Sequence, residues 1–373
     1  MRSDDGAMRD DASWMTRALD LAVRGQGCVE PNPMVGCVLV NKGRVVGEGW
    51  HASFGGPHAE AVALRAAGRA ARDATVFVTL EPCCHHGKTP PCTKDLIHAG
   101  VRRVVIAEQD IFHKVDGGGI AELKAAGLDV VVGLKEDDAR WLNAPYRKLI
   151  RTGRPWIVAK WAMTLDGKIA TSEGDSQWIS CEASREIVHT LRGRMDAIVV
   201  GSRTAHIDNP VLTPRPPGTR TPTRIVVDTS ASLPLDSRLV RSARETPVLV
   251  ACGESVPEEA VRGLTDAGVE VMRCAGSNSH QRLGWLLDEL GRRQMTNLLV
   301  EGGGELLGSL LDIGAIDEVH CFIGPKIVGG RQARSPFAGV GVPRIEMARI
   351  VDRLSVKRIG QDIYLTGRTR ETT

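Results

Sequence analysis

The chain has 373 residues, more than the roughly 100 to 200 of a single ordinary domain, so we expect two domains. The 48 Lys and Arg nearly balance the 45 Asp and Glu, so the net charge does not favour binding to nucleic acid. Only two Tyr and five Phe are available to stack against bases. An odd set of nine cysteines, and the lack of any run near the roughly 18 apolar residues of a membrane span, predict a cytoplasmic protein that binds no membrane.

Helices and strands alternate in the first 138 residues. A helix is predicted over 13–25, because apolar residues recur at helical spacing after a Ser cap and a Gly closes the segment. Two strands joined by an Asn-Lys-Gly turn follow over 35–50. The next predicted elements are a helix over 58–68, a strand over 74–80, a helix over 92–100, a strand over 101–108, and a helix and strand over 119–133. This alternation indicates an α/β layer fold.

The domain boundary is predicted near residues 146–155. The segment "NAPYRKLIRTGRPW" at 143–156 holds two prolines and a basic cluster, and its alternative interpretation is a long surface loop within one domain. Beyond it a strand over 157–163 restarts the alternation. Five further β-rich runs, at 197–201, 223–228, 247–252, 297–303 and 318–324, are separated by helices such as 182–193 and 283–294. We therefore expect α/β domains at 1–150 and 151–373.

Three short pieces of the first domain carry the residue types of a metal site. They are "PHAEA" at 57–61, "EPCCHH" at 81–86 and "TPPC" at 89–92. A catalytic zinc uses three protein ligands and keeps an open position for water. Chemistry alone allows two ligand sets, which share His58 and Cys83 and differ in taking Cys92 or His86. The set with Cys92 is the favoured one.

Glu60 stands two residues after His58, within reach of a water on the same metal. In zinc deaminases such a Glu carries protons, and His-x-Glu followed by Pro-Cys and a second Cys is their signature. The commonest form places the second Cys three residues after the first, where this chain has His86. A structural zinc is the rival interpretation, although such a site normally closes with a fourth Cys or His.

A glycine-rich turn marks the second domain. The strand "NLLV" leads into Glu301 and three glycines, followed by an amphipathic helix whose N-terminus favours phosphate. A P-loop is absent, because no Gly-Lys-Ser/Thr follows the glycines. The Rossmann fingerprint is also absent, because Leu307 occupies the position of its last required Gly. A turn without a cofactor is the alternative. Lys160 follows a strand, where it would either face a ligand or point into solvent.

The motifs together resemble a known family, the bifunctional deaminase-reductases of riboflavin biosynthesis. The resemblance runs from about Trp14 to Gly367 and rests on "PNPMVGCVLV", "GGPHAEAVAL", "VTLEPCCHHGKTPPC", "KWAMTLDGKIAT", "SQWIS", "DNPVLT" and "EGGGELLGSLL". It implies a cytidine-deaminase-like three-layer α/β domain and a dihydrofolate-reductase-like α/β domain. The implied small-molecule substrate is a diaminopyrimidinone ribosylamino phosphate, which is deaminated and then reduced at the ribose.

The resemblance also implies functional residues in the first domain. Zn²⁺ is expected on His58, Cys83 and Cys92, with Glu60 as the proton carrier. The positions that match the family's substrate contacts are Asn32, His51, Lys88 and Asp110. One departure is the sequence "QDIFHK", in which Phe112 replaces the family's Asn and removes a hydrogen-bonding contact.

For the second domain the resemblance implies NADPH and a likeness to dihydrofolate reductase. The cofactor contacts that it predicts are Ala162, Trp178, Thr204, Asp208, Thr229, Gly303, Gly304, Glu305, Leu306, Leu307, Gly308 and Ser309. The substrate contacts that it predicts are Ser176, Arg192, Leu212, Arg215 and Glu301, to which Lys160 is added on chemical grounds. A homo-oligomer is also expected.

Two rival functions remain at the level of sequence. One is a single-activity reductase whose deaminase domain has degenerated, for which Phe112 is the only sequence feature. The other is a different base deaminase fused to an unrelated domain, against which the nine-residue spacing from Cys83 to Cys92 argues.

Overall fold

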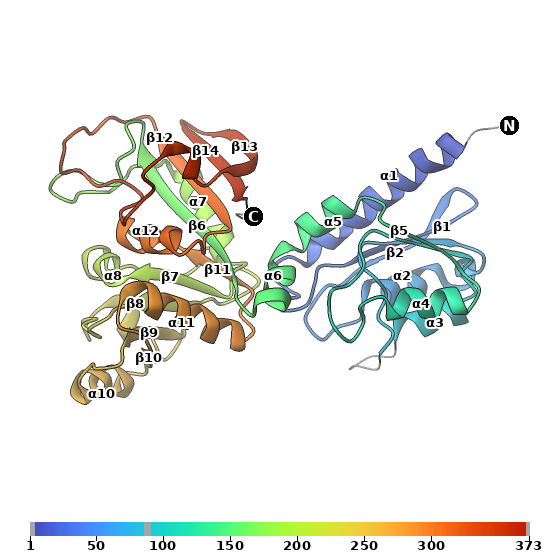
Figure 1. Ribbon diagram of the computed structural model, residues 1–373, viewed down its shortest axis with the longest axis horizontal. Helices are drawn as coiled ribbons and strands as arrows, with labels where there is room; N and C mark the ends of the chain where they lie inside the picture. Colours follow the sequence, from blue (N-terminus) through green and yellow to red (C-terminus); the bar gives the residue numbers. More distant parts are fainter. Residues whose placement is uncertain (1–3, 86–90, 371–373) are drawn as a thin grey trace. The chain divides into compact units, whose positions relative to one another are not determined.

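The computed structural model describes residues 4–85 and 91–370. The chain divides into two compact units, Met1–Thr152 and Gly153–Thr373 (Figure 1). Each unit is a sheet covered by helices, and the predicted α/β class is confirmed for both. In the described part of the chain, no helix has the length and apolar character needed to cross a membrane.

The first unit is built on five strands. They are β1 (Gly36–Asn41), β2 (Arg44–Trp50), β3 (Thr75–Val78), β4 (Arg103–Ile106) and β5 (Asp129–Val132). The helices are α1 (Asp4–Ala22), α2 (Ala59–Ala67), α3 (Cys92–His98), α4 (Gly118–Ala125), α5 (Glu136–Leu142) and α6 (Ala144–Thr152), with 3-10 turns at Val23–Gly25 and Gly68–Ala71. The sheet order is β2-β1-β3-β4-β5, in which β1 runs antiparallel to both neighbours and β3, β4 and β5 are parallel.

This unit has three layers. Alternate residues of the sheet pack against α2, α3 and α4 on one face and against α1 and α5 on the other (Figure 1). Glycines in β2 allow α2 to lie directly on the sheet, because a Cβ at Gly49 would stand 2.4 Å from the carbonyl oxygen of Ala59. The first turn of α2, which carries Glu60, is therefore fixed against the sheet.

The second unit has nine strands. They are β6 (Trp156–Thr164), β7 (Ala197–Gly201), β8 (Thr223–Val227), β9 (Val248–Gly253), β10 (Glu270–Cys274), β11 (Asn297–Val300), β12 (Glu318–Gly324), β13 (Val351–Ile359) and β14 (Asp362–Thr369). The helices are α7 (Glu182–Arg192), α8 (Ser202–Asp208), α9 (Arg238–Arg241), α10 (Glu258–Asp266), α11 (Ser279–Arg292) and α12 (Gly304–Asp312), with a 3-10 turn at Ile345–Met347.

Seven of these strands run parallel. The sheet order is β10-β9-β8-β7-β11-β6-β12-β14-β13, and only the β12-β14 and β14-β13 pairs are antiparallel. One apolar cluster joins the sheet to α11 and α12, and a second joins its other face to α9 and α10. Ligands of such sheets bind beyond the carboxyl ends of the parallel strands, so that edge is where a cofactor site is expected.

The structure contains elements that the sequence analysis did not predict. The segment 143–156, in which the boundary was predicted, contains helix α6, which ends where the two compact units divide; its Pro145 lies in the first turn, where a missing N–H costs nothing. Helix α5 and strand β10 were not predicted. The hairpin β13-β14 was also missed, and it adds two antiparallel strands to the predicted parallel arrangement.

Candidate active sites

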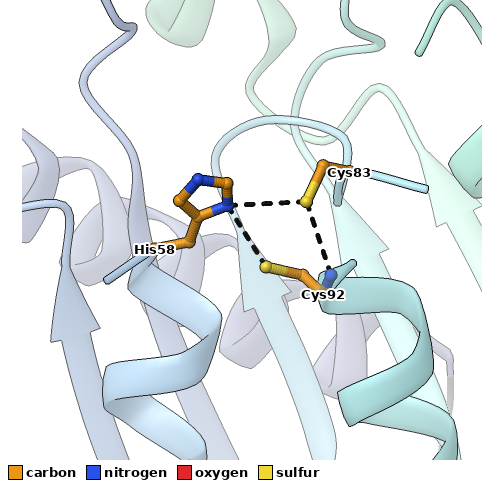
Figure 2. Close-up of side chains that lie close together, drawn as sticks. All are labelled: His58, Cys83 and Cys92. Carbon is orange, nitrogen blue, oxygen red and sulfur yellow. Dashed lines mark hydrogen bonds between the residues drawn. The ribbon is translucent and has the colours of Figure 1, made fainter. Parts of the chain in front are cut away.

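His58, Cys83 and Cys92 meet at one edge of the first unit (Figure 2). His58 precedes the first residue of α2, Cys83 follows β3 through a short loop, and Cys92 opens α3. The Nδ1 atom of His58 lies 3.5 Å from Sγ of Cys83 and 3.3 Å from Sγ of Cys92. In a tetrahedral zinc site with bonds of about 2.3 Å to sulfur and 2.0 Å to nitrogen, such atoms stand roughly 3.6 Å apart. The three residues therefore fit zinc.

Hydrogen bonding in this triangle favours anionic sulfur. The hydrogen bond from Cys92 lowers the pKa of Cys83 to about 4, and burial only partly opposes it. The hydrogen bond to Cys83, together with burial, raises the pKa of Cys92. The hydrogen bond with Cys83 also raises the pKa of His58. Cys83 is therefore favoured as the thiolate, the form in which a cysteine binds a metal.

Glu60 lies in the first turn of α2 and is only 3% exposed. Its Oε2 atom is buried and has no hydrogen-bond partner among the described residues. Burial raises the pKa of Glu60 to about 7, against the opposing effect of His58. A carboxylate that can gain and lose a proton near neutrality is suited to general acid-base catalysis.

Two of the predicted substrate contacts lie beside this triangle. The His51 ring stands 5.7 Å from that of His58, centroid to centroid. Nδ1 of His51 bonds to the carbonyl oxygen of Pro57 at 3.0 Å, and Nε2 lies 3.2 Å from Nδ2 of Asn32. His51 is buried and both ring nitrogens are engaged, so it orients the amide of Asn32.

The remaining predicted contacts in this domain are Asp110 and Lys88. Oδ1 of Asp110 accepts hydrogen bonds from the backbone N–H of Phe112 at 3.0 Å and from the Tyr146 hydroxyl at 2.9 Å. The ring of Phe112 lies near those of His85 and His113. Lys88 and the alternative ligand His86 lie outside the described residues.

A cavity of about 1340 Å³ opens beyond the carboxyl ends of the parallel strands in the second unit. This exceeds the range of about 300 to 1,000 Å³ that is usual for a single small-molecule site, so there is room for a cofactor and a substrate together. The predicted residues that line it are Lys160, Ala162, Ser176, Trp178, Arg192, Thr204, Asp208, Leu212, Arg215, Thr229, Glu301, Gly303, Gly304, Glu305, Leu306 and Ser309.

An ion-pair cluster forms the inner wall of this cavity. Arg192 binds Glu301 through two hydrogen bonds of 2.5 and 2.8 Å, and Nζ of Lys160 lies 3.3 Å from Oε2 of the same carboxylate. Burial alone would raise the pKa of Glu301, but the charges and hydrogen bonds of Arg192 and Lys160 lower it to about 2. Lys160 therefore faces the cavity and not bulk solvent.

Comparison with known proteins places the chain in a family. The sequence matches the RibD C-terminal domain over residues 155–365 and the cytidine and deoxycytidylate deaminase zinc-binding region over residues 8–108. The riboflavin biosynthesis protein RibD of Actinobacillus pleuropneumoniae is 42% identical over 355 residues, which cover 95% of this chain and 94% of that protein. The chain belongs to the RibD family.

Solved structures agree with this assignment. RibD of Acinetobacter baumannii is 35% identical and has a TM-score of 0.85, covering 98% of this chain and 100% of that one. A Thermotoga maritima protein is 33% identical over 98% of this chain and 100% of its own, also with a TM-score of 0.85. It is described as a diaminohydroxyphosphoribosylaminopyrimidine deaminase/5-amino-6-(5-phosphoribosylamino)uracil reductase.

The RibD assignment confirms the predicted function at the level of the family. This chain is a bifunctional enzyme of riboflavin biosynthesis, with a zinc-binding deaminase domain and a reductase domain that uses NADPH. The predicted resemblance to cytidine deaminases in the N-terminal domain is likewise confirmed.

The glycine-rich turn of the second unit fits a dinucleotide, with two exceptions in the predicted run. Gly303 precedes α12 and lines the cavity, and a Cβ there would meet only Oγ1 of Thr204 at 3.5 Å. Bare backbone at the start of a nine-residue helix suits phosphate. Leu307 instead lies in the core, and a Cβ at Gly308 would stand 1.9 Å from the carbonyl oxygen of Ala338. These two positions serve packing.

Sequence reasoning missed a set of supporting residues around the candidate site of the first unit. Glu81 accepts backbone hydrogen bonds from Asp110 and Gly117, both at 3.1 Å, and from Ile120 at 3.0 Å, which fixes the loop that carries Asp110. Asn143 and Tyr146 were missed because their segment was read as a domain boundary. Had a helix been predicted there, the three-residue spacing of Asn143 and Tyr146 would have placed both side chains on one helix face.

Proposed function

We propose that the first domain removes a ring amino group from a diaminopyrimidinone ribosylamino phosphate, and that the second reduces the ribosyl group of the product to a ribityl chain with NADPH. The observation that carries the first step is the buried Glu60, with its unpartnered Oε2, beside the triangle of His58, Cys83 and Cys92. The printed description of the Thermotoga maritima relative, which names both activities, supports the same substrates.

In the first step His58, Cys83 and Cys92 would hold zinc. Zinc in such a site lowers the pKa of a water toward neutrality and so supplies the nucleophile. Glu60 would carry the first proton of this water to the ring nitrogen, and then the remaining hydroxyl proton to the amino group, which leaves as ammonia. Its raised pKa, about 7, allows it to act in both directions.

Binding of the pyrimidine falls to Asn32 and Asp110. The Asn32 amide is oriented by His51, and the Asp110 carboxylate by two donors, so both present hydrogen-bonding groups in fixed directions. Lys88 is proposed to face the substrate phosphate. Phe112 offers no side-chain hydrogen bond, and its backbone N–H is used to orient Asp110.

In the second step the cavity would hold the substrate together with NADPH, which would supply the hydride. Arg192, Arg215, Ser176 and Leu212 bind the substrate, while Lys160 stands beside Glu301 where its ammonium can stabilise charge on the opening sugar. The cofactor contacts are assigned to Ala162, Trp178, Thr204, Asp208, Thr229, Gly303, Gly304, Glu305, Leu306 and Ser309, all of which line the cavity. Trp178 is 60% exposed beneath the Arg185 guanidinium, which stands 4.6 Å from the centre of its ring.

The domain assignment is part of the proposal. We assign deamination to residues 1–150 and reduction to 151–373. The two compact units meet at 152 and 153, which supports this division.

Mass spectrometry of the reaction tests the function directly. Purified protein is incubated with the diaminopyrimidinone ribosylamino phosphate, with and without NADPH. Without NADPH we expect a gain of about one mass unit, because oxygen replaces an amine, and with NADPH a further gain of about two, because hydride and a proton are added. Unchanged substrate in both reactions would overturn the deaminase assignment. Reduction of pre-deaminated substrate alone would favour the single-activity reductase.

We further infer that the chain works as a homo-oligomer in the cytoplasm, without nucleic acid or membrane. Strand β13 lies at the edge of its sheet, and exposed apolar residues gather on and before this hairpin. They are Val340, Val342, Ile345, Met347, Ile350, Leu354, Val356 and Ile363. A second copy pairing with this edge would cover them.

Light scattering after size-exclusion chromatography tests the oligomer. We expect twice the 40.2 kDa mass of the chain, or a larger multiple, and a shift toward 40.2 kDa in Val356→Asp. A wild-type monomer at micromolar concentration would contradict the inference.

A further inference from the structure

Asn143, between α5 and α6, and two residues of α6 make three side-chain attachments to the deaminase site. The first is Asn143, whose Oδ1 accepts from the backbone N–H of Met34 and whose Nδ2 donates to the carbonyl of Met34, both at 2.9 Å. Met34 lies two residues after Asn32. Asn143 is 1% exposed, and its own carbonyl accepts from the backbone N–H of Arg147 in α6 at 2.9 Å. The loop that carries Asn32 is therefore tied to the start of this helix.

The second attachment is Tyr146. Its hydroxyl donates to Oδ1 of Asp110 at 2.9 Å, and both side chains are buried. The same oxygen accepts from the backbone N–H of Phe112. Two donors converging on one carboxylate oxygen fix the plane of the group, so the orientation of Asp110 depends on the Tyr146 hydroxyl.

The third attachment is Arg147, whose guanidinium pairs with the buried carboxylate of Glu108. Glu108 stands two residues before Asp110, and its backbone carbonyl accepts from the N–H of Glu81 at 2.9 Å. Glu81 in turn holds the loop from Asp110 to Ile120 through three backbone hydrogen bonds. Arg147 therefore anchors the strand end from which that loop departs.

Asn143, Tyr146 and Arg147 stand at positions i, i+3 and i+4, the spacing of one helix face. We propose that this face is a positioning element of the deaminase site, in which Tyr146 holds the Asp110 carboxylate in the orientation that receives the pyrimidine. The proposal rests on the proposed function, since it takes Asp110 and Asn32 as substrate contacts. A role in packing alone would not need the Tyr146 hydroxyl, because the ring by itself fills the space.

Tyr146→Phe tests the proposal, because it removes one hydroxyl and keeps the ring. We expect the KM for deamination to rise about tenfold, the loss of one hydrogen bond to a charged group, while kcat changes less than about twofold. Zinc content should stay at about one ion per chain, and reduction of pre-deaminated substrate by the same protein should be unchanged. Arg151→Ala, an exposed residue in the last turn of α6, is the matched control and should match wild type in all four measurements.

Hydrogen exchange gives a second measurement that does not depend on activity. In Tyr146→Phe the backbone amides of residues 109–120 should exchange faster than in wild type, and in Arg151→Ala they should not. An unchanged KM together with unchanged exchange would overturn the proposal. A fall in kcat and zinc content with a normal KM would assign Tyr146 to the metal region and would also overturn it.

The design separates this proposal from the proposed function. If zinc-loaded wild type fails to deaminate the substrate, the proposed function fails, and exchange over 109–120 still decides whether Tyr146 positions that loop. If Tyr146→Phe does not fold, as judged by loss of the far-UV circular dichroism signal and of a cooperative thermal transition for the first domain, Asn143→Asp takes its place. It keeps the acceptor for the Met34 N–H, loses the donor to the Met34 carbonyl, and should also raise KM with zinc retained.

Discussion

Cys92→Ala should release zinc from the protein and reduce deamination below detection. Cys92 supplies one of three candidate ligand atoms, all of which lie within 4.8 Å of one another, and two remaining protein ligands hold zinc far more weakly. Metal analysis after dialysis should fall from about one zinc per chain toward zero. Reduction of pre-deaminated substrate should remain within about twofold of wild type, because the cavity lies in the other compact unit.

Glu60→Gln is the control that separates metal loss from loss of proton transfer. It should retain zinc, because Glu60 is not among the three candidate ligands, but lower kcat for deamination by about 10³, within the range typical of general acid-base catalysis. His86→Ala should retain both zinc and activity. Retained zinc and deamination in Cys92→Ala, with loss of both in His86→Ala, would contradict the ligand set and favour His86.

The residues of this metal triangle could be predicted from the sequence because each stands at the end of a regular element. His58 and Cys92 adjoin helices, Cys83 follows a strand, and parallel strands with their crossover helices bring such ends together. Their residue types and order carry chemical meaning as well. Spacing alone could not decide between Cys92 and His86, because local pattern does not encode the path of the eight residues between Cys83 and Cys92.

The supporting residues could not be predicted in the same way. Asn143, Tyr146 and Arg147 act across long sequence separations, and Asn143 binds a residue 109 positions earlier in the chain. Two prolines made their segment read as a linker, although one of them lies in the first turn of α6, where it is compatible with a helix. Contacts of this kind depend on tertiary packing, which a single sequence does not reveal.

Tertiary packing also explains why two predicted cofactor contacts do not line the reductase cavity. Leu307 and Gly308 belong to a run that resemblance assigned to the cofactor, yet one lies in the core and the other abuts the backbone of Ala338. When a helix such as α12 contacts a ligand with its first turn, some of its later residues pack against its own domain. Predicting every residue from Gly303 to Ser309 as a cofactor contact therefore included residues that only pack.

Glu301→Gln should destabilise the second domain by about 3 kcal/mol and lower kcat/KM of the reductase about 100-fold. The buried carboxylate is held by Arg192 and Lys160, and removing its charge leaves two cations without their partner. Calorimetry should show a lower transition temperature for this domain, and deamination should be unaffected. Asp352→Asn, which breaks the exposed pair with Arg370 in the same domain, is the control and should leave the transition temperature nearly unchanged.

The pH dependence of the second domain's stability is a further test of the ion-pair cluster of Glu301, Arg192 and Lys160. Burial would raise the pKa of Glu301, but Arg192 and Lys160 lower it from 4.5 to about 2 in the folded state. A depressed folded-state pKa contributes stability that is fully present above pH 4.5 and is lost as pH falls through about 2. Wild type should therefore lose stability more steeply than Glu301→Gln between these values, and the two should converge near pH 2. Parallel curves across that window would show that the carboxylate is not held ionised by its partners, and the role given to Lys160 beside the opening sugar would lose its electrostatic basis.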